Sequence, residues 1–343
     1  MPTRRLTMKR IAIGLAAMTA IVALAGGEVA GQQPVGERSL KRERTWTVDG
    51  IDVLPVRGNV YLLAGAGANV TVQAGPEGLL LVDTGAAGQT GRISASLREV
   101  FPDQKVRTII NTNDDADHVG GNGDLVRAFG GPRGAAQGGP LGEGNQNVGV
   151  QVISHEKAMG RMAKGSPGRP ALEGDALPGS TFFTAKKEFF SNGEVVEVLW
   201  HPAHTDGDVL VFFRSSEVIS AGDAWVTTSY PVIDEARGGS IQGVLDSLNT
   251  IIDIAVPERN QMGGTRIVSG HGYIGNESDI VEYRDMVTIL RDRIRDLVKA
   301  GRTLAQVKAA RPTLDYDGVY GATTGPWTTD LFIEAVYRGV GGK

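Results

Sequence analysis

The sequence predicts an α/β sandwich, in which two packed β-sheets carry helices on their outer faces. Each half of the chain contains a series of short β-like runs, and each series closes with helix-like stretches. Glycine makes up 48 of the 343 residues, about twice its usual share, which favours many tight turns around a scaffold. The composition, 41% hydrophobic and 22% charged, is that of a folded protein and excludes disorder, collagen and coiled coil.

The first half of the chain supplies the first sheet. We expect strands at residues 51–56, 59–63, 69–73, 79–82, 106–111 and 151–154, and helices at residues 89–100 and 156–163. The glycine-rich segment 130–149 has no periodicity and is therefore predicted to be a loop.

The second half supplies the second sheet and a helical tail. We expect strands at residues 194–200, 209–214, 217–220 and 266–269, and helices at residues 240–254, 279–299, 304–310 and 328–337. The last three helices follow the final strand. We therefore expect one domain over residues 45–276 and a helical extension, residues 277–343, packed on the same domain.

The N-terminal segment has the pattern of an export signal. Four basic residues lie within the first ten, and the apolar run 11–25 that follows is too short to span a bilayer comfortably. We expect residues 1–31 to be a signal peptide and residues 32–44 a polar lead-in. The mature protein would then be periplasmic or secreted, with no stable membrane span after signal cleavage. An uncleaved N-terminal anchor is the alternative.

Charge and cysteine content exclude several classes of function. Lys and Arg number 35 against 39 Asp and Glu, a net charge of −4, so the basic excess that nucleic acid requires is absent. The chain has no cysteine, which excludes disulfides, thiolate metal sites and cysteine nucleophiles. Any metal must use His, Asp, Asn or Glu, and the expected partner is a small-molecule substrate.

A dense polar cluster follows the strand predicted at residues 106–111. Within residues 111–122 lie the acids Asp114, Asp115 and Asp117, with Asn113 directly before them and His118 directly after them. Three acids this close would repel one another unless a cation neutralised them. A solvated acidic turn is the alternative, because Asp and Asn are ordinary turn formers.

Three later segments favour a metal site over a turn. His204 follows the strand at 194–200, Asp223 follows the strand at 217–220, and His271 follows the strand at 266–269. Each places a metal-capable side chain in a loop at a strand end, where loops carry functional groups over a rigid scaffold.

In order, spacing and strand-end context, these motifs resemble those of the metallo-β-lactamase superfamily. Its signature is H-x-H-x-D-H before Gly-Gly-Asn, then a histidine before Thr-x-Gly-Asp, an aspartate after Gly, and a histidine in a Gly-His-Gly turn. The resemblance runs from Asp83 in an Asp-Thr-Gly turn to His271. It implies a four-layer αββα metallo-β-lactamase sandwich, here with extra C-terminal helices, and a metallo-hydrolase similar to glyoxalase II.

The resemblance also implies roles for individual residues. His204 would bind a first metal, whereas Asp117, His118 and His271 would bind a second, with Asp223 as the bridge between them. Asp83 would lie behind the ligands and hydrogen-bond the loop backbone near the metals.

The chain departs from the signature at its two leading histidines. Asn113 and Asp115 stand at these positions, so the first site would consist of Asn113, Asp115, His204 and Asp223. This oxygen-rich set disfavours Zn²⁺ relative to Mn²⁺ or Fe²⁺, whereas the second site accepts Zn²⁺ readily. We expect one or two zinc ions, with manganese or iron as alternatives at the oxygen-rich site.

By resemblance, the protein is an exported metal-dependent hydrolase. Metal-activated hydroxide would attack an ester, thioester, lactone or amide bond, β-lactams included, and Asp117 would be the catalytic residue that orients the nucleophile. Two alternatives stay open: an iron-dependent oxidoreductase on the same fold, and a non-catalytic binding protein with a degenerate metal site. His155 and His201 are expected to be hydrogen-bonded structural or surface imidazoles rather than ligands.

Overall fold

The computed structural model describes residues 45–131, 149–166, 169–260 and 263–342. By their contacts, residues 43–343 group into one unit. The expected signal peptide, residues 1–31, the lead-in, residues 32–44, and most of the glycine-rich loop lie outside the described residues.

The first sheet has eight strands in the order β1-β2-β3-β4-β5-β6-β7-β8. The neighbours from β1 to β5 are antiparallel, and those from β5 to β8 are parallel. The strands are β1 Trp46–Val48, β2 Ile51–Arg57, β3 Val60–Ala64, β4 Val70–Gln73, β5 Leu79–Val82, β6 Val106–Ile110, β7 Gln151–His155 and β8 Ser180–Phe182.

The second sheet has six strands in the order β14-β13-β12-β11-β10-β9. Only β12 and β13 are parallel neighbours in it, so both sheets are mixed. The strands are β9 Lys186–Ser191, β10 Glu194–Trp200, β11 Val209–Phe213, β12 Val218–Ser220, β13 Arg266–Val268 and β14 Ile274–Gly275.

The two sheets pack face to face through an apolar core. On β5, Leu80 and Val82 join a buried cluster with residues of the second sheet, such as Val211 on β11. Leu79 and Leu81 join a different cluster with helix α1 on the outer face. Side chains alternate between the two faces of a strand, so β5 is apolar throughout because both of its faces are covered.

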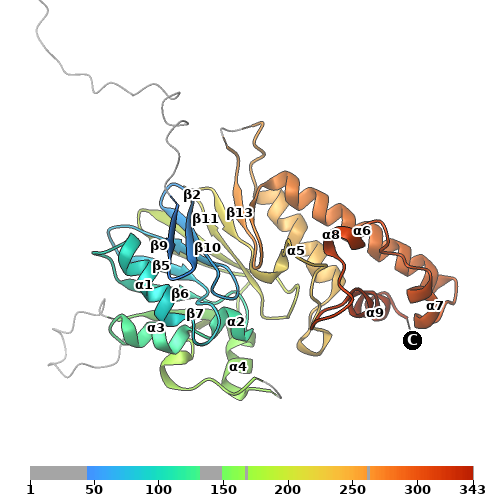
Figure 1. The fold of residues 1–343 in the computed structure, drawn as a ribbon, viewed down its shortest axis with the longest axis horizontal. Helices are drawn as coiled ribbons and strands as arrows, with labels where there is room; N and C mark the ends of the chain where they lie inside the picture. Colours follow the sequence, from blue (N-terminus) through green and yellow to red (C-terminus); the bar gives the residue numbers. More distant parts are fainter. Residues whose placement is uncertain (1–44, 132–148, 167–168, 261–262, 343) are drawn as a thin grey trace, which may run out of the picture. The chain divides into compact units, whose positions relative to one another are not determined.

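Helices cover the outer faces of the sheets (Figure 1). The helices of the first half are α1 Thr90–Val100, α2 Ala116–Val119, α3 Asn122–Ala128 and α4 Glu156–Lys164, of which α1, α3 and α4 contact strands of the first sheet. The helices of the second half are α5 Ile241–Ile254, α6 Glu277–Lys299, α7 Leu304–Ala309, α8 Asp317–Tyr320 and α9 Thr329–Gly339. Buried residues of α5, α6 and α9 share one apolar cluster with β11, β12 and β13. The predicted α/β sandwich with additional C-terminal helices is therefore confirmed.

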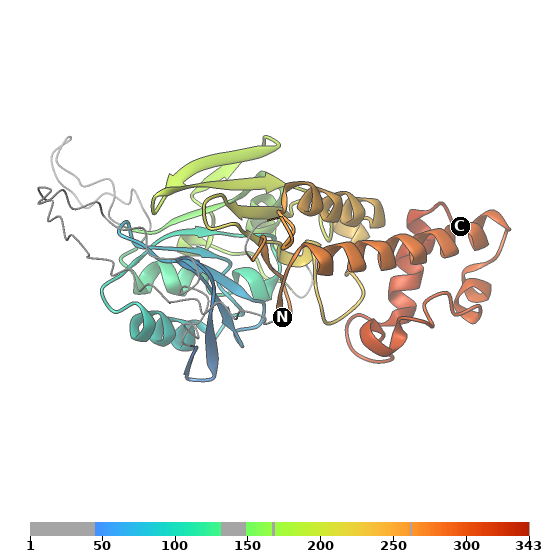
Figure 2. The ribbon, with the colours of Figure 1, turned by 90° about the horizontal axis from the view of Figure 1, so that it is seen from above.

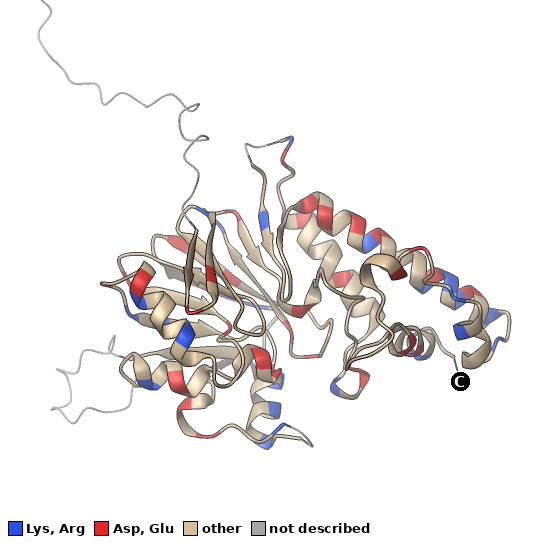
Figure 3. Cartoon of the chain, in the orientation of Figure 1, with Lys and Arg blue, Asp and Glu red and all other residues tan. Residues whose placement is uncertain are grey.

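Helix α6 is the longest described helix, and the C-terminal elements follow it in the chain. Figure 2 shows α6 running outward from the sheets, with the later helices around its far end. Acidic residues mark the start of α6, and basic residues appear among the acidic ones further along it (Figure 3), where Arg284 pairs with Asp285 and Arg291 with Asp292. Across the described ranges we find no helix with the length and apolarity that a membrane crossing needs.

Every predicted strand and helix is present, with bounds within two residues of the expectation. The sequence analysis missed several short elements, among them β9 and α3. Strand β9 alternates exposed and half-buried residues at the edge of its sheet, so it lacks an apolar run. Helix α3 begins in a polar, glycine-containing segment that is typical of turns.

Candidate metal centre

The side chains predicted as metal ligands converge at the ends of β6, β10, β12 and β13. They form two sets of three residues, and within each set the ligand atoms all lie within 4.8 Å of one another. The sets are Asp117, His118 and His271, and Asp115, His204 and Asp223. The remaining residue, Asn113, donates a hydrogen bond from Nδ2 to Asp223 Oδ2 at 3.0 Å. The seven predicted residues therefore form one cluster.

Close backbone packing fixes the loop that carries Asp117 and His118. Helix α2 has four residues and leads into Gly120 and Gly121. A Cβ atom on Gly120 would lie 2.2 Å from the backbone nitrogen of Ala87, and one on Gly121 would lie 2.4 Å from the carbonyl oxygen of Thr84. These contacts explain why two glycines follow the acidic cluster.

Asp83 orients His118. Its buried carboxylate accepts hydrogen bonds from the backbone nitrogen and the hydroxyl of Thr112 at 2.8 and 2.6 Å, and lies 2.7 Å from His118 Nδ1. His118 Nε2 therefore points to the other side, toward the candidate site. Burial lowers the pKa of His118, but the carboxylates of Asp223 and Asp83 on its two sides raise it well above its usual value.

The donor set around His118 fits a divalent cation. His118 Nε2 lies 3.0 Å from Asp223 Oδ2, and His271 Nε2 lies 3.2 Å from Asp117 Oδ2 and 3.6 Å from Asp223 Oδ1. Four ligands at the usual zinc distances in a tetrahedron would be separated by roughly 3.3 Å. His118 Nε2 and Asp223 Oδ1 are buried and make no hydrogen bond, as expected of atoms that face a metal position.

One side of this donor set is open. His118 is fully buried, whereas the side chains of Asp117 and His271 are 40% and 33% exposed. Burial raises the pKa of Asp117, but its contact with His271 and the charge of His118 outweigh burial and lower it. A ligand can therefore approach from the side of Asp117 and His271.

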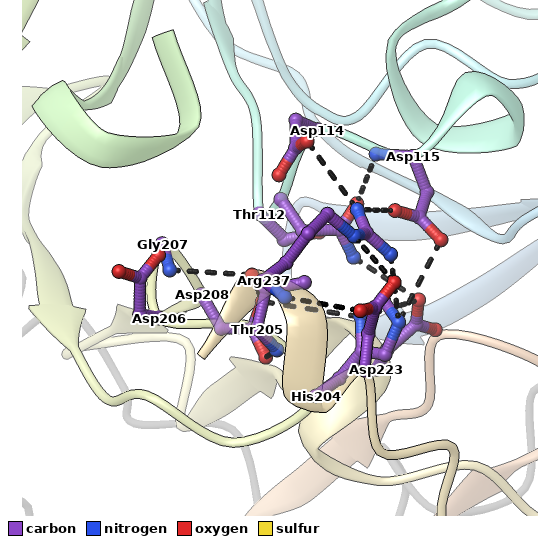
Figure 4. A network of polar contacts seen from close by, with 12 residues as sticks. Thr112, Asp114, Asp115, His204, Thr205, Asp206, Gly207, Asp208, Asp223 and Arg237 are labelled. Carbon is purple, nitrogen blue, oxygen red and sulfur yellow. Dashed lines mark hydrogen bonds and ion pairs between the residues drawn. The ribbon is translucent and has the colours of Figure 1, made fainter. Parts of the chain in front are cut away.

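In the set of Asp115, His204 and Asp223, arginines already bind the donor atoms. Asp115 Oδ1 accepts a hydrogen bond from Arg169 Nη1 at 2.6 Å and another from Arg237 Nη1. Arg237 Nη2 lies 3.3 Å from His204 Nε2. Figure 4 shows Arg237 reaching toward Asp114, Asp115 and His204. Burial raises the pKa of Asp115, but nearby His204 and the hydrogen bonds from Arg237 and Arg169 lower it to about 2.

Both polar ends of Asn113 also have protein partners. Its Nδ2 binds Asp223, and its Oδ1 accepts a hydrogen bond from the backbone nitrogen of Asp115 at 2.8 Å. The ligand roles of Asn113 and Asp115 stay predictions. Because these donors and those of Asp115 and His204 already contact protein groups, the set of Asn113, Asp115, His204 and Asp223, as arranged here, does not fit a metal ion in addition to the one at His118.

The sequence analysis did not find the arginines. Arg161 lies 2.8 Å from Asp114, Arg169 binds Asp115, and Arg237 contacts both acids. Each arginine lies far from the acids in sequence. Adjacent Asp114 and Asp115 were the available signal. Two neighbouring carboxylates that become buried need positive partners, and one metal ion would not neutralise both of them together with Asp117.

A cavity of about 630 Å³ borders the centre. Its lining includes Asp117, His204 and His271 of the centre. It also includes apolar residues, among them Ile233 and, from the C-terminal segment, Trp327. His155 and His201 belong to neither ligand set, and His155 stacks on the Trp200 ring at 4.8 Å.

The family model of the metallo-beta-lactamase superfamily matches residues 63–259, more than half of the chain. The chain belongs to the metallo-β-lactamase superfamily. Members are typically metal-dependent hydrolases, and the two sheets, the outer helices and the strand-end cluster described above agree with this assignment.

Solved structures show the same fold. The stereoselective inverting sec-alkylsulfatase Pisa1 from Pseudomonas sp. aligns at a TM-score of 0.56 and 15% identity, over 83% of this chain and 49% of that one. The chain thus spans about half the length of the alkylsulfatase. A metallo-beta-lactamase from Pontibacter korlensis gives 0.51 and 16%, over 69% and 99%, and DIM-1 metallo-beta-lactamase gives 0.51 and 12%, over 71% and 99%. No curated protein sequence matches the chain.

Proposed function

We propose that this protein is a metal-dependent hydrolase with one divalent cation bound by Asp117, His118, His271 and Asp223. The observation that carries the proposal is the donor set itself, whose neighbouring atoms lie 3.0 to 3.6 Å apart, with unpartnered buried atoms beside a cavity. Zinc is the metal we expect, because imidazole and carboxylate donors at these separations suit it.

Different residues of the chain have different roles in the proposed reaction. When bound, a divalent cation lowers the pKa of adjacent water to near neutrality and polarises the scissile bond. Asp117, the most exposed acid of the set, orients the attacking water from the cavity side. Asp83 holds the ring of His118 through Nδ1, so that Nε2 keeps its direction during turnover.

The cavity supports a substrate with a polar reacting group and an apolar body. The centre supplies the polar side, and Val226, Val232, Ile233 and Trp327 supply an apolar wall. The candidate bonds are carboxylic esters, thioesters, lactones and amides. The alkylsulfatase aligns with 83% of this chain, and this similarity adds sulfate esters to the candidates. The basic and apolar segment within residues 1–31 supports export to the periplasm or the medium.

The test combines metal analysis with hydrolysis assays. Apoprotein prepared with a chelator is assayed against an aryl ester, a thioester, a lactone, a chromogenic cephalosporin and a secondary alkyl sulfate. We expect hydrolysis of at least one substrate after one equivalent of Zn²⁺ or Mn²⁺ is added, and none before. Hydrolysis that survives the chelator, or a protein that binds no metal, would overturn the proposal. Bound iron with no hydrolysis would favour the oxidoreductase instead.

Two histidine variants sharpen this test. His118→Ala removes a fully buried donor and should abolish both metal binding and hydrolysis. His201→Ala is the matched control, because His201 lies three residues before His204 and outside both ligand sets. It should keep one equivalent of metal and the activity of the parent.

A further inference from the structure

We propose that the guanidinium of Arg237 fills the position of the first cation, so that the centre combines one exchangeable metal ion with one permanent arginine charge. This inference rests on the proposed function, because it concerns the other half of the same donor cluster. The following observations carry it.

Arg237 contacts the atoms that a first metal would use. One guanidinium nitrogen binds Asp115 Oδ1 and lies 3.3 Å from Asp114 Oδ2, and the other lies 3.3 Å from His204 Nε2. A planar guanidinium can hold a carboxylate and an imidazole at once because its donors form a fixed fork. A metal ion and this guanidinium cannot both occupy the space between Asp115 and His204.

The backbone holds Arg237 in this place. The Arg237 Nε binds Asp234 at 2.7 Å, and the backbone nitrogen of Asp234 in turn donates to the carbonyl oxygen of His204 at 3.0 Å. The Arg237 carbonyl accepts a hydrogen bond from Asp206 at 2.9 Å. A Cβ on Gly239 would lie 2.0 Å from the His204 carbonyl oxygen, so the loop needs glycine to approach so closely. Arg237 and His204 are therefore built as one unit.

The charges around Arg237 balance without a second metal ion. Four acids, Asp114, Asp115, Asp206 and Asp234, pair with four cations, Lys157, Arg161, Arg169 and Arg237. The Arg237 side chain is only 12% exposed. A second divalent ion beside the guanidinium would meet strong repulsion, since water screens charges poorly at such a buried position. The two positive centres of this site are therefore different in kind, and only one of them can be removed by a chelator.

Arg237 also lines the cavity, together with Asp117 and His271. We assign it as a positioning residue of the centre, because its guanidinium binds Asp115 and lies 3.3 Å from His204 Nε2.

The experiment is a Zn²⁺ titration of apoprotein by calorimetry, with bound metal counted by elemental analysis. Wild type should bind one equivalent. Arg237→Ala should bind two, and the second ion should bind at least about 100-fold more tightly than any second ion on wild type, because the repelling charge has gone. Arg237→Lys keeps the charge and should stay at one equivalent.

Arg338→Ala is the matched control. Arg338 lines the same cavity but pairs with Glu235 and Glu334 rather than with the ligand set. It should bind one equivalent. If Arg237→Ala does not fold, Arg237→Gln replaces it as the neutral variant. A Co²⁺ titration of wild type, read by visible absorption, gives a second count that needs no variant.

The outcomes separate this inference from the proposed function. Two tight equivalents on wild type, or one equivalent on the neutral variant, would overturn the role of Arg237 and leave the hydrolase proposal standing. No metal on wild type would overturn the hydrolase proposal, and this inference with it.

Discussion

Replacement of Asp83 by Asn is the most direct test of how the centre is held in shape. The Asp83 backbone has φ +66°, in the left-handed region that Asn tolerates well, so the variant changes the charge without straining the turn. An amide can still accept the hydrogen bond from the Thr112 backbone nitrogen at 2.8 Å. It presents one oxygen instead of two, so it cannot also serve both the Thr112 hydroxyl and His118 Nδ1, which share the second carboxylate oxygen at 2.6 and 2.7 Å.

The expected cost follows from these contacts. Breaking a buried charged pair with hydrogen bonds costs about 3–5 kcal/mol, and Asn keeps part of the network, so we expect a loss of about 3 kcal/mol in the apoprotein. His118 then loses its fixed orientation, and Zn²⁺ affinity should fall by about 10- to 100-fold. Chemical denaturation gives the first quantity and calorimetric titration the second.

A control separates stability from positioning. Asp279→Asn weakens the cap of α6, where Asp279 accepts a hydrogen bond from the backbone nitrogen of Asn276 at 2.8 Å. It should lower stability by about 0.5–2 kcal/mol and leave Zn²⁺ affinity unchanged. An Asp83→Asn protein that binds Zn²⁺ as tightly as wild type would refute the argument that Asp83 positions His118.

Two further predictions concern regions next to the centre. Burial lowers the pKa of His155, whose ring stacks on Trp200, so the folded protein favours the neutral ring. The resulting stabilisation is fully present above the unfolded-state pKa of about 6.5. It is lost as the pH falls toward the pKa of the folded state. The free energy of unfolding should therefore fall more steeply between about pH 7 and pH 5 in wild type than in His155→Phe, and equal slopes would contradict this. Gly239→Ala should destabilise the protein by at least about 2 kcal/mol through its clash with His204, whereas Gly160→Ala, in open space within α4, should stabilise it by about 0.5–1 kcal/mol, both measured by denaturation.

The sandwich could be predicted because its central strands are apolar runs between turn residues. Strands β5 and β11 are buried along their whole length, so their sequences, LLLV and VLVFF, carry the signal without any knowledge of their neighbours. Strand β9 could not be found in this way, since its sequence KKEFFS alternates at the exposed edge of a sheet and is paired on one side only. Its position is set by its pairing with β10.

The cluster of candidate ligands could be predicted for a similar reason, because each candidate lies in the segment that follows a strand. The arginines could not, because their role depends on three-dimensional neighbours. Arg237 ends a single turn of 3-10 helix, Glu235–Arg237, and nothing in the adjacent sequence distinguishes it from a surface arginine. The weak Zn²⁺ affinity expected of the oxygen-rich first site stays a prediction. The contacts of Asp115 with two guanidinium groups give a separate reason to expect no metal ion there.

The residues at 113, 115 and 237 should therefore behave as one unit, which yields a prediction that single changes would miss. Asn113→His combined with Asp115→His restores the two leading histidines of the superfamily signature, yet it leaves Arg237 beside His204 and removes the carboxylate that Arg237 and Arg169 bind. We expect this double variant to lose about 3 kcal/mol of stability, since the nearly buried Arg237 and the partly exposed Arg169 both lose a partner, and to bind one equivalent of Zn²⁺ like the parent. Addition of Arg237→Ala should recover part of the stability and create the second Zn²⁺ site, because three imidazoles and Asp223 then face an open position. A double variant that binds two equivalents with Arg237 in place would show that the guanidinium moves aside freely, and the arginine would then be a neighbour of the first site rather than its occupant.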